Sequence, residues 1–257
     1  MKRMFGMMTG IALAASAQAA LHTETVEYKQ GDTALKGYLA YDPALKGKRP
    51  GVLVVHEWWG LNGYPKMRAN ELAKLGYVAF AADIYGAGVV AKTPQEAGAL
   101  AGKFKGDRQL LRDRVNAGLE ELKRQPQCDP KRVAAIGYCF GGTTVLELAR
   151  SGADIAGIVS FHGGLDTPTR DAKNIKCKVL ICHGGDDLFE PASDIAALQD
   201  EFRKAGIDWQ MNIYGGAMHG FTNPANKDSK IQGVAYNERA DKRSWAAMKL
   251  FFAEIFR

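Results

Sequence analysis

A cysteine occupies the centre of a glycine-flanked pentapeptide in the stretch "AAIGYCFGGTTV", residues 134–145. Gly137-Tyr138-Cys139-Phe140-Gly141 has the GxSxG spacing of a nucleophile elbow, with cysteine in place of serine. Such an elbow is a strained turn between a strand and a helix, and its glycines let the two elements approach closely. The pattern therefore indicates either a cysteine nucleophile or a small buried side chain that follows a strand.

A thiol with an ordinary pKa near 8.5 is mostly protonated at neutral pH, so a nucleophilic cysteine needs a base. In α/β hydrolases the order along the chain is nucleophile, acid, base. His162 and His183 precede glycines at the ends of apparent strands, where a structural hydrogen bond to the turn is favoured. His219, in "AMHGF", follows the last strand, and we predict that it is the base for Cys139.

The stretch "HGGDDLFEP" supplies two candidates for the acid that orients the base. Asp187 lies four residues before Pro191, which opens the next predicted helix, and we favour it over Asp186. An aspartate after two glycines is also a common turn residue or helix cap, which is the favoured interpretation of Asp186. Asp166, after the preceding strand, is a third candidate.

The early stretch "VVHEWWGLNGY" ends a strand where such folds supply a second oxyanion donor. We predict that the backbone amides of Trp58 and Phe140 form the oxyanion hole. Glu57 has two interpretations, because a carboxylate between apolar stretches costs free energy unless it is paired. It either partners the Cys139 thiol or forms an ordinary ion pair with a surface cation.

The remaining aromatic side chains near these strand ends suggest the nature of the pocket. We expect Trp59 and Tyr85 to line it together with Trp58, which would favour a planar or apolar acyl group. Residues 88–127 contain helical stretches that could form a lid over such a pocket.

Short, nearly all-apolar segments alternate with segments of helical periodicity, which is typical of strands buried on both faces of a parallel sheet. The expected strands are "GVLVVHEW", "YVAFAADIYG", "RVAAIGYC", "IAGIVSFHG" and "KVLICHGGDD", preceded by an antiparallel pair around Gly31-Asp32. Helices are expected in "PKMRANELAKLG", "PASDIAALQDEFRKAG" and "DKRSWAAMKLFFAEIF". The sequence thus predicts an α/β fold with a doubly wound, mostly parallel sheet and helices on both faces, which binds ligands at the carboxyl ends of its strands.

The first residues resemble a bacterial secretory signal: two cations, an uncharged apolar run and Ala17-Gln18-Ala19. We predict a signal peptide over residues 1–19, cleavage after Ala19, and one mature domain over residues 20–257 in the periplasm or outside the cell. The apolar run is shorter than the roughly 20 residues that span a bilayer. Removing Lys2 and Arg3 lowers the formal net charge from +6 to +4.

The remaining positive charge is interleaved with acidic residues, so the sequence gives no sign of nucleic-acid binding. We expect a small-molecule ester or lactone as the partner and no membrane span after cleavage. The oligomeric state is not specified by any pattern. No metal-ligand spacing and no CxxC motif occur, so we expect neither a cofactor nor a metal, and a redox role for Cys139 lacks support.

The other three cysteines are interpreted as small buried side chains. Cys177 and Cys182 lie five residues apart on one predicted strand, about 16 Å apart, which is too far for a disulfide. A bridge between Cys128 and Cys177 remains open.

Taken together, "IGYCFGG", "VVHEWWGLN", "HGGDDLFEP" and "AMHGF" resemble the dienelactone hydrolase family over nearly the whole mature chain. The resemblance implies an α/β-hydrolase fold with a catalytic triad of Cys139, Asp187 and His219. It also implies that Glu57 interacts with the resting thiol until substrate displaces it.

The chain departs from that family at two positions. Members that cleave dienelactones hold the substrate carboxylate with two arginines, one just after a "DxY" strand end and one four residues beyond the catalytic histidine. Here Gly86 and Ala87 follow "DIY", and Asn223 stands four residues after His219. A carboxylated butenolide would therefore lose its bidentate anchor.

We therefore expect an exported hydrolase that cleaves ester or lactone bonds through a thioacyl-enzyme. The alternatives are a thioesterase or general carboxylesterase of loose specificity, and a degenerate hydrolase that acts as a ligand-binding module.

Overall fold

The computed structural model describes residues 20–257. The signal peptide predicted over residues 1–19 lies outside the described residues. Within residues 20–257 no helix is both long and apolar enough to cross a bilayer.

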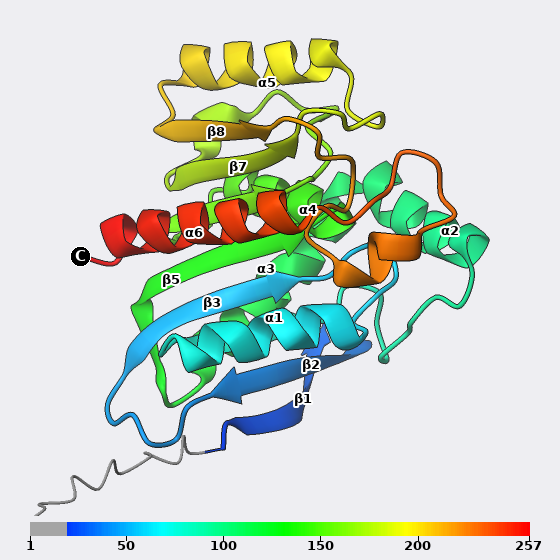
Figure 1. Cartoon of the computed structure of the whole chain (residues 1–257). Helices are drawn as coiled ribbons and strands as arrows, with labels where there is room; N and C mark the ends of the chain where they lie inside the picture. Colours follow the sequence, from blue (N-terminus) through cyan, green and yellow to red (C-terminus); the bar gives the residue numbers. More distant parts are fainter. Residues whose placement is uncertain (1–19) are drawn as a thin grey trace, which may run out of the picture.

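One eight-stranded sheet forms the centre of the molecule, with the strand order β1-β2-β4-β3-β5-β6-β7-β8 (Figure 1). The strands are β1 (His22–Gln30), β2 (Thr33–Tyr41), β3 (Arg49–Val55), β4 (Val78–Ala82), β5 (Cys128–Tyr138), β6 (Gly157–Phe161), β7 (Lys178–Gly184) and β8 (Trp209–Tyr214). The first two strands are antiparallel and β2 pairs antiparallel with β4, whereas all other neighbours are parallel. This confirms the predicted mostly parallel sheet.

Helices cover both faces of this sheet. They are α1 (Gly63–Lys74), α2 (Pro94–Gly106), α3 (Arg108–Arg124), α4 (Phe140–Arg150), α5 (Ala192–Ala205) and α6 (Glu238–Ile255), and two short 3-10 helices span Ala172–Asn174 and Pro224–Asp228. Helices α1 and α6 pack on one face, and α3, α4 and α5 pack on the other. The arrangement confirms the α/β-hydrolase fold that the sequence predicts.

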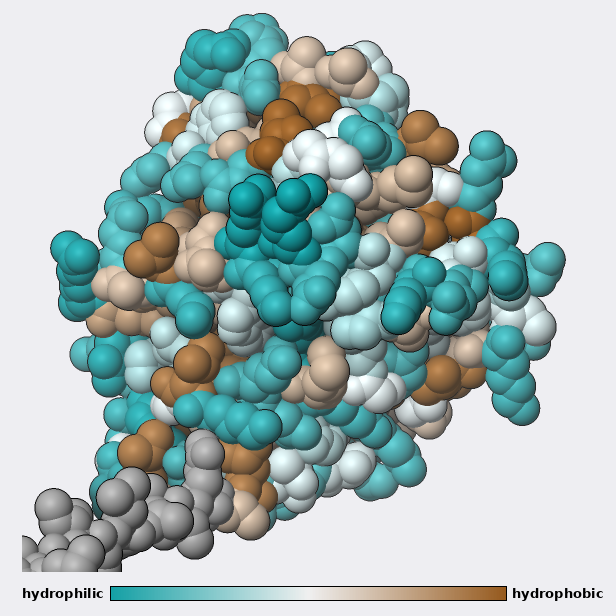
Figure 2. All heavy atoms as spheres, in the orientation of Figure 1, coloured by the Kyte–Doolittle hydropathy of each residue, from teal (hydrophilic) through white to brown (hydrophobic). Residues whose placement is uncertain are grey.

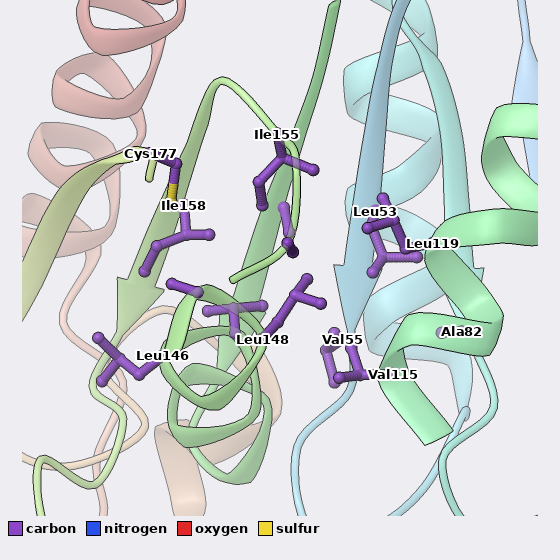
Figure 3. Close-up of a cluster of buried hydrophobic side chains, with 14 of the residues drawn as sticks. Leu53, Val55, Ala82, Val115, Leu119, Leu146, Leu148, Ile155, Ile158 and Cys177 are labelled. Carbon is purple, nitrogen blue, oxygen red and sulfur yellow. The ribbon is translucent and has the colours of Figure 1, made fainter. Parts of the chain in front are cut away.

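The pleat of the central strands explains why their sequences are continuously apolar. In β3, Leu53 and Val55 point toward α3 and α4, whereas Val52 and Val54 point toward α1 and α6. Figure 3 shows Leu53 and Val55 facing side chains of α3, including Leu119. Because both faces of the strand are buried, both sets of side chains must be hydrophobic. On the face of the molecule in Figure 2, by contrast, hydrophobic residues form small separate groups among hydrophilic ones.

The segment 88–127 divides into two helices with different surroundings. Helix α3 buries Leu111, Val115, Leu119 and Leu122 against the sheet. Helix α2 lies at the carboxyl end of the parallel strands, beside the loop that follows β8 (Figure 1). Only α2 is thus placed where a covering element for a pocket could act.

All four cysteines carry free thiols in the described part of the chain. Cys128, Cys177 and Cys182 are buried, as expected for small apolar side chains. The bridge between Cys128 and Cys177 that the sequence left open is not formed.

Candidate active site

Cys139 stands at a sharp turn between β5 and α4. Its backbone has φ 54° and ψ −116°, a left-handed conformation that costs free energy in a residue with a Cβ. A Cβ added at Gly137 would lie 1.9 Å from the Gly141 carbonyl oxygen, and one at Gly141 would lie 2.3 Å from the Val55 carbonyl oxygen. The two glycines are therefore required by the close approach of strand and helix, and the turn has the geometry of a nucleophile elbow.

Gly137→Ala is expected to lower the free energy of unfolding by roughly 3 kcal/mol or more, because the backbone must move to admit the methyl group. Gly98→Ala is the control, since Gly98 lies inside α2 and an added Cβ there would meet no atom within 4 Å. Alanine at that position should raise stability by about 0.5–1 kcal/mol. Urea unfolding of both variants measures the difference, and equal midpoints would contradict the steric argument.

His219 lies between the cysteine and an aspartate. Its Nε2 is 3.1 Å from Cys139 Sγ, and its Nδ1 is 2.8 Å from Asp187 Oδ2. The second oxygen of Asp187 accepts a hydrogen bond of 2.9 Å from the Phe189 amide. Asp187 is therefore held at both oxygens and orients the imidazole toward the sulfur.

The other candidate acids lie elsewhere. Asp186 is exposed on the turn after β7, and its side chain takes no part in the contact with His219. Asp166 pairs with Arg108 at 2.9 Å. The structure thus brings together Cys139, His219 and Asp187, the combination that the sequence favoured.

Charge around His219 favours its protonated form. Burial alone would lower the pKa of His219, but the negative charge available at Cys139 and the hydrogen bonds with Asp187 and Cys139 raise this pKa well above its ordinary value. A proton on the imidazole in turn stabilises a thiolate at Sγ. His219 is therefore placed within reach of the proton of the Cys139 thiol.

Glu57 is buried at the mouth of β3, with 4% of its surface exposed. Its Oε2 accepts a hydrogen bond of 2.6 Å from the Asn223 side chain. Burial raises the pKa of Glu57 to about 7, and this hydrogen bond and the charges of His219 and Arg68 only partly oppose the effect. Its hydrogen-bond partner is an amide, so the alternative of an ion pair with a surface cation is wrong.

Glu57→Gln is expected to stabilise the protein above neutral pH. Because the pKa of Glu57 is about 7 when folded and near 4.5 when unfolded, the cost of burying its charge appears as the pH rises through that interval. The gain should be about 2–3 kcal/mol at about pH 8 and should vanish near pH 4. Unfolding curves at both pH values measure it, with the exposed Glu120→Gln as control. A gain that does not depend on pH would contradict a titrating Glu57.

The two backbone amides predicted for the oxyanion hole differ in their position in the fold. Phe140 is the first residue of α4, so its N–H has no acceptor inside the helix. Within residues 20–257 the Trp58 amide donates to no backbone carbonyl, while the Trp58 carbonyl accepts a hydrogen bond of 2.7 Å from the Tyr85 hydroxyl. Both residues line the same cavity as Cys139, and the oxyanion hole stays a prediction.

A cavity of about 410 Å³ opens onto Cys139 and His219. Trp58 and Trp59 line it, as predicted. Tyr85 does not, and its prediction as a pocket residue is wrong. Its ring packs against Phe104 and Phe140 beneath the cavity, and its hydroxyl fixes the Trp58 carbonyl. Tyr85 therefore acts on the cavity only through its contacts with Phe140 and Trp58, which line it.

In the described residues no three histidine, cysteine, aspartate or glutamate side chains are grouped so as to hold a metal ion. The polar side chains that line the cavity are those of Glu57, Lys105, Cys139, Glu190, His219 and Asn226.

Comparison with known proteins matches residues 35–256 to the model of the dienelactone hydrolase family. The chain belongs to the dienelactone hydrolase family. Similarity to a protein named as a carboxymethylenebutenolidase and to a dienelactone hydrolase-like structure supports a hydrolase, and this protein is one.

Two relatives from the genus Aquifex are similar to this dienelactone hydrolase family member over almost their whole length. "Protein usf" of Aquifex pyrophilus is 31% identical over 237 residues, covering 90% of this chain and 98% of its own. A protein of Aquifex aeolicus named as a carboxymethylenebutenolidase is 30% identical over 234 residues, covering 89% and 97%.

A solved structure is more similar still. A dienelactone hydrolase-like promiscuous phosphotriesterase from metagenomic libraries superposes with a TM-score of 0.90 at 42% identity, covering 93% of this chain and all of that one. The described residues therefore share the fold of that structure along its whole length.

Several residues at the cavity of this family member were not identified from the sequence. Phe189 packs edge-on against the His219 ring, with centroids 5.1 Å apart. Burial raises the pKa of Glu190 to about 7, although its carboxylate accepts a hydrogen bond from the Leu165 amide. The remaining lining residues that were missed are Gly98, Ala101, Gly102, Lys105, Gly164, Gly220, Asn226, Ile231 and Val234.

The signals for these residues differ. Phe189 and Glu190 belong to "HGGDDLFEP", so their closeness to Asp187 could have identified them. The residues from α2 and from the loop after His219 reach the cavity only through tertiary packing, and no local pattern marks them.

Proposed function

We propose that the protein is an exported hydrolase that cleaves ester or lactone bonds through a Cys139–His219–Asp187 triad and a thioacyl-enzyme. One observation carries the proposal: Cys139 Sγ lies 3.1 Å from His219 Nε2 in a cavity of about 410 Å³, and Asp187 holds the other imidazole nitrogen at 2.8 Å. These distances are those of a nucleophile, its base and the group that orients the base.

In the acylation half of the reaction, His219 holds the proton of the Cys139 thiol and Sγ attacks the carbonyl carbon. The Trp58 and Phe140 amides donate to the resulting oxyanion. The carbon–oxygen bond then breaks, His219 gives the proton to the leaving oxygen, and a thioester remains on Cys139.

In the deacylation half, a water gives a proton to His219 and its oxygen attacks the thioester carbon. The carbon–sulfur bond breaks, the acid leaves, and the sulfur recovers its pairing with protonated His219. For a lactone, the alcohol and the acid are parts of one product. Trp58 and Trp59 at the cavity favour a flat or apolar acyl group.

Intact-protein mass spectrometry with peptide mapping after a short incubation with p-nitrophenyl acetate tests this proposal. A transient acetyl group on Cys139, with continued p-nitrophenol release, is expected. An unmodified thiol without turnover would favour a ligand-binding module, and a permanent adduct would mean that deacylation is lost.

A second candidate is cleavage of phosphotriesters. The structure at 42% identity belongs to a promiscuous phosphotriesterase, and this chain lacks both arginines that would commit the pocket to a carboxylated substrate. Replacing the ester by diethyl p-nitrophenyl phosphate in the same experiment distinguishes the two: repeated turnover supports this activity, and a stable diethylphosphoryl adduct on Cys139 argues against it.

Export is the part of the proposal that rests on the sequence alone. Expression of the full chain in a Gram-negative host, followed by fractionation and N-terminal sequencing, is expected to yield a periplasmic protein that begins at Ala20. A full-length protein in the cytosol would overturn it.

A further inference from the structure

Two strained residues stand side by side at the ends of neighbouring strands. The ladder between β5 and β6 ends with the pair Tyr138 and Phe161. The next residue on each strand, Cys139 and His162, has a positive φ of 54° and 40°. Neither is glycine, so each conformation costs free energy and must be held by its surroundings.

A hydrogen bond joins these two residues. The Cys139 amide lies 3.0 Å from the Phe161 carbonyl oxygen and 3.1 Å from His162 Nδ1. Because Nδ1 accepts from an N–H, it carries no proton, and the proton of the neutral ring is on Nε2. Burial, followed by the charge of His219, lowers the pKa of His162 well below its ordinary value, which keeps the ring neutral.

The other side of the His162 ring contacts the loop that carries His219. His162 Nε2 lies 2.7 Å from the Thr222 hydroxyl, and Thr222 is three residues beyond His219. The same hydroxyl accepts a hydrogen bond of 2.6 Å from Tyr64, and the Thr222 carbonyl accepts one of 2.7 Å from Arg68. Both donors belong to α1, so Thr222 is one of the points at which this loop is fixed to the rest of the molecule.

We propose that His162 is a positioning residue that ties the backbone of Cys139 to the loop of His219 and thereby sets the distance between sulfur and imidazole. The inference rests on the proposed function, since it concerns the same Cys139–His219 pair. His162 transfers no proton. Its ring acts as a spacer of fixed length, because it accepts from one partner and donates to the other.

Removal of the hydrogen bond between His162 and Thr222 should change the position of His219 relative to Cys139. Thr222→Val keeps the branched shape of the side chain but removes the acceptor for His162. The loop can then shift relative to the elbow, and a misplacement of about 1 Å between reacting groups can cost about a hundredfold in rate. A smaller shift should weaken the ion pair of Cys139 and His219, so less thiolate is present near neutral pH.

The rate at which iodoacetamide alkylates Cys139, followed by mass spectrometry, reports the fraction of thiolate without requiring turnover. For Thr222→Val we expect the rate near neutral pH to fall about tenfold. At about pH 10, where a thiol is ionised with or without a partner, the rate should match that of the unchanged protein. A change in access to the cavity would instead alter both rates together.

Three further variants separate positioning from stability. Thr222→Ser keeps the hydroxyl and should retain the alkylation rate near neutral pH. Tyr64→Phe removes another hydrogen bond to the same hydroxyl and should lower the melting temperature without lowering that rate. In His162→Asn the asparagine tolerates positive φ and keeps an acceptor for the Cys139 amide, but its side chain is too short to reach Thr222. This variant should therefore also lose alkylation rate near neutral pH and keep it at about pH 10. It replaces Thr222→Val if that variant does not fold.

The outcomes distinguish this inference from the proposed function. If the unchanged protein shows no enhanced alkylation near neutral pH, the pairing of Cys139 with His219 is itself wrong. If it shows the enhancement and the folded Thr222→Val or His162→Asn variant keeps it, only the positioning role is wrong. An equal loss in Tyr64→Phe, or no retention in Thr222→Ser, would also overturn that role.

Discussion

Cys139→Ala is expected to abolish hydrolysis of p-nitrophenyl acetate, with kcat/KM lower by about 10³- to 10⁶-fold. Sγ is the atom that lies 3.1 Å from His219 Nε2, and no covalent acyl intermediate can form without it. The variant should still fold, because alanine fits where a cysteine side chain stood and the elbow glycines are unchanged. Steady-state kinetics and the midpoint of urea unfolding, measured on the same preparation, check both halves of this expectation.

Cys177→Ala and Cys182→Ala are the matched controls for this prediction. Burial raises the pKa of each of these thiols to about 12, so both are protonated near neutral pH and neither lines the cavity. Each folded variant should keep its activity within about twofold, while losing up to about 1 kcal/mol of stability from the missing sulfur. Residual turnover in Cys139→Ala comparable to that of the controls would remove Cys139 from the mechanism.

The strands of the fold could be predicted because their burial on both faces leaves a direct trace in the sequence. The segment that forms β3 alternates its side chains between two cores, so each position of "GVLVV" is apolar. The turn at Gly31 and the end of α5 at Gly206 could also be predicted from the sequence, since both positions have a positive φ that favours glycine.

The site was less completely predictable, because a sequence fixes which residues follow a strand but not which way each side chain points. Asp186 and Asp187 are adjacent in the same turn, yet one is exposed and the other contacts His219. Tyr85 follows β4 near the cavity, yet its ring turns inward against Phe104. Lys105 reaches the cavity from α2, and that contact depends on how α2 packs against strand ends that are distant from it in the sequence.

Asp187→Asn is expected to lower kcat by about 10²- to 10⁴-fold with little change in folding. The carboxylate accepts a hydrogen bond from His219 Nδ1 at 2.8 Å, so it favours the tautomer with its proton on Nδ1 and a free lone pair on Nε2, which faces the sulfur. It also stabilises the protonated ring. An amide placed there can donate to Nδ1, which would favour the opposite tautomer. Loss of the negative charge also removes one cause of the raised pKa of His219, so the rise of kcat with pH, which needs neutral His219 to accept a proton from water, should shift toward lower pH.

Asp186, the neighbouring aspartate, provides the control for this prediction. Asp186→Asn changes the same functional group one residue away, on an exposed side chain, and should leave kcat within about twofold. Comparing kcat and its pH profile in the two variants tests whether one specific carboxylate orients the base. If both lose activity equally, the general negative charge of this turn matters more than its geometry. If neither does, His219 is held by the packing of Phe189 and its own loop, and the triad reduces to a cysteine–histidine pair.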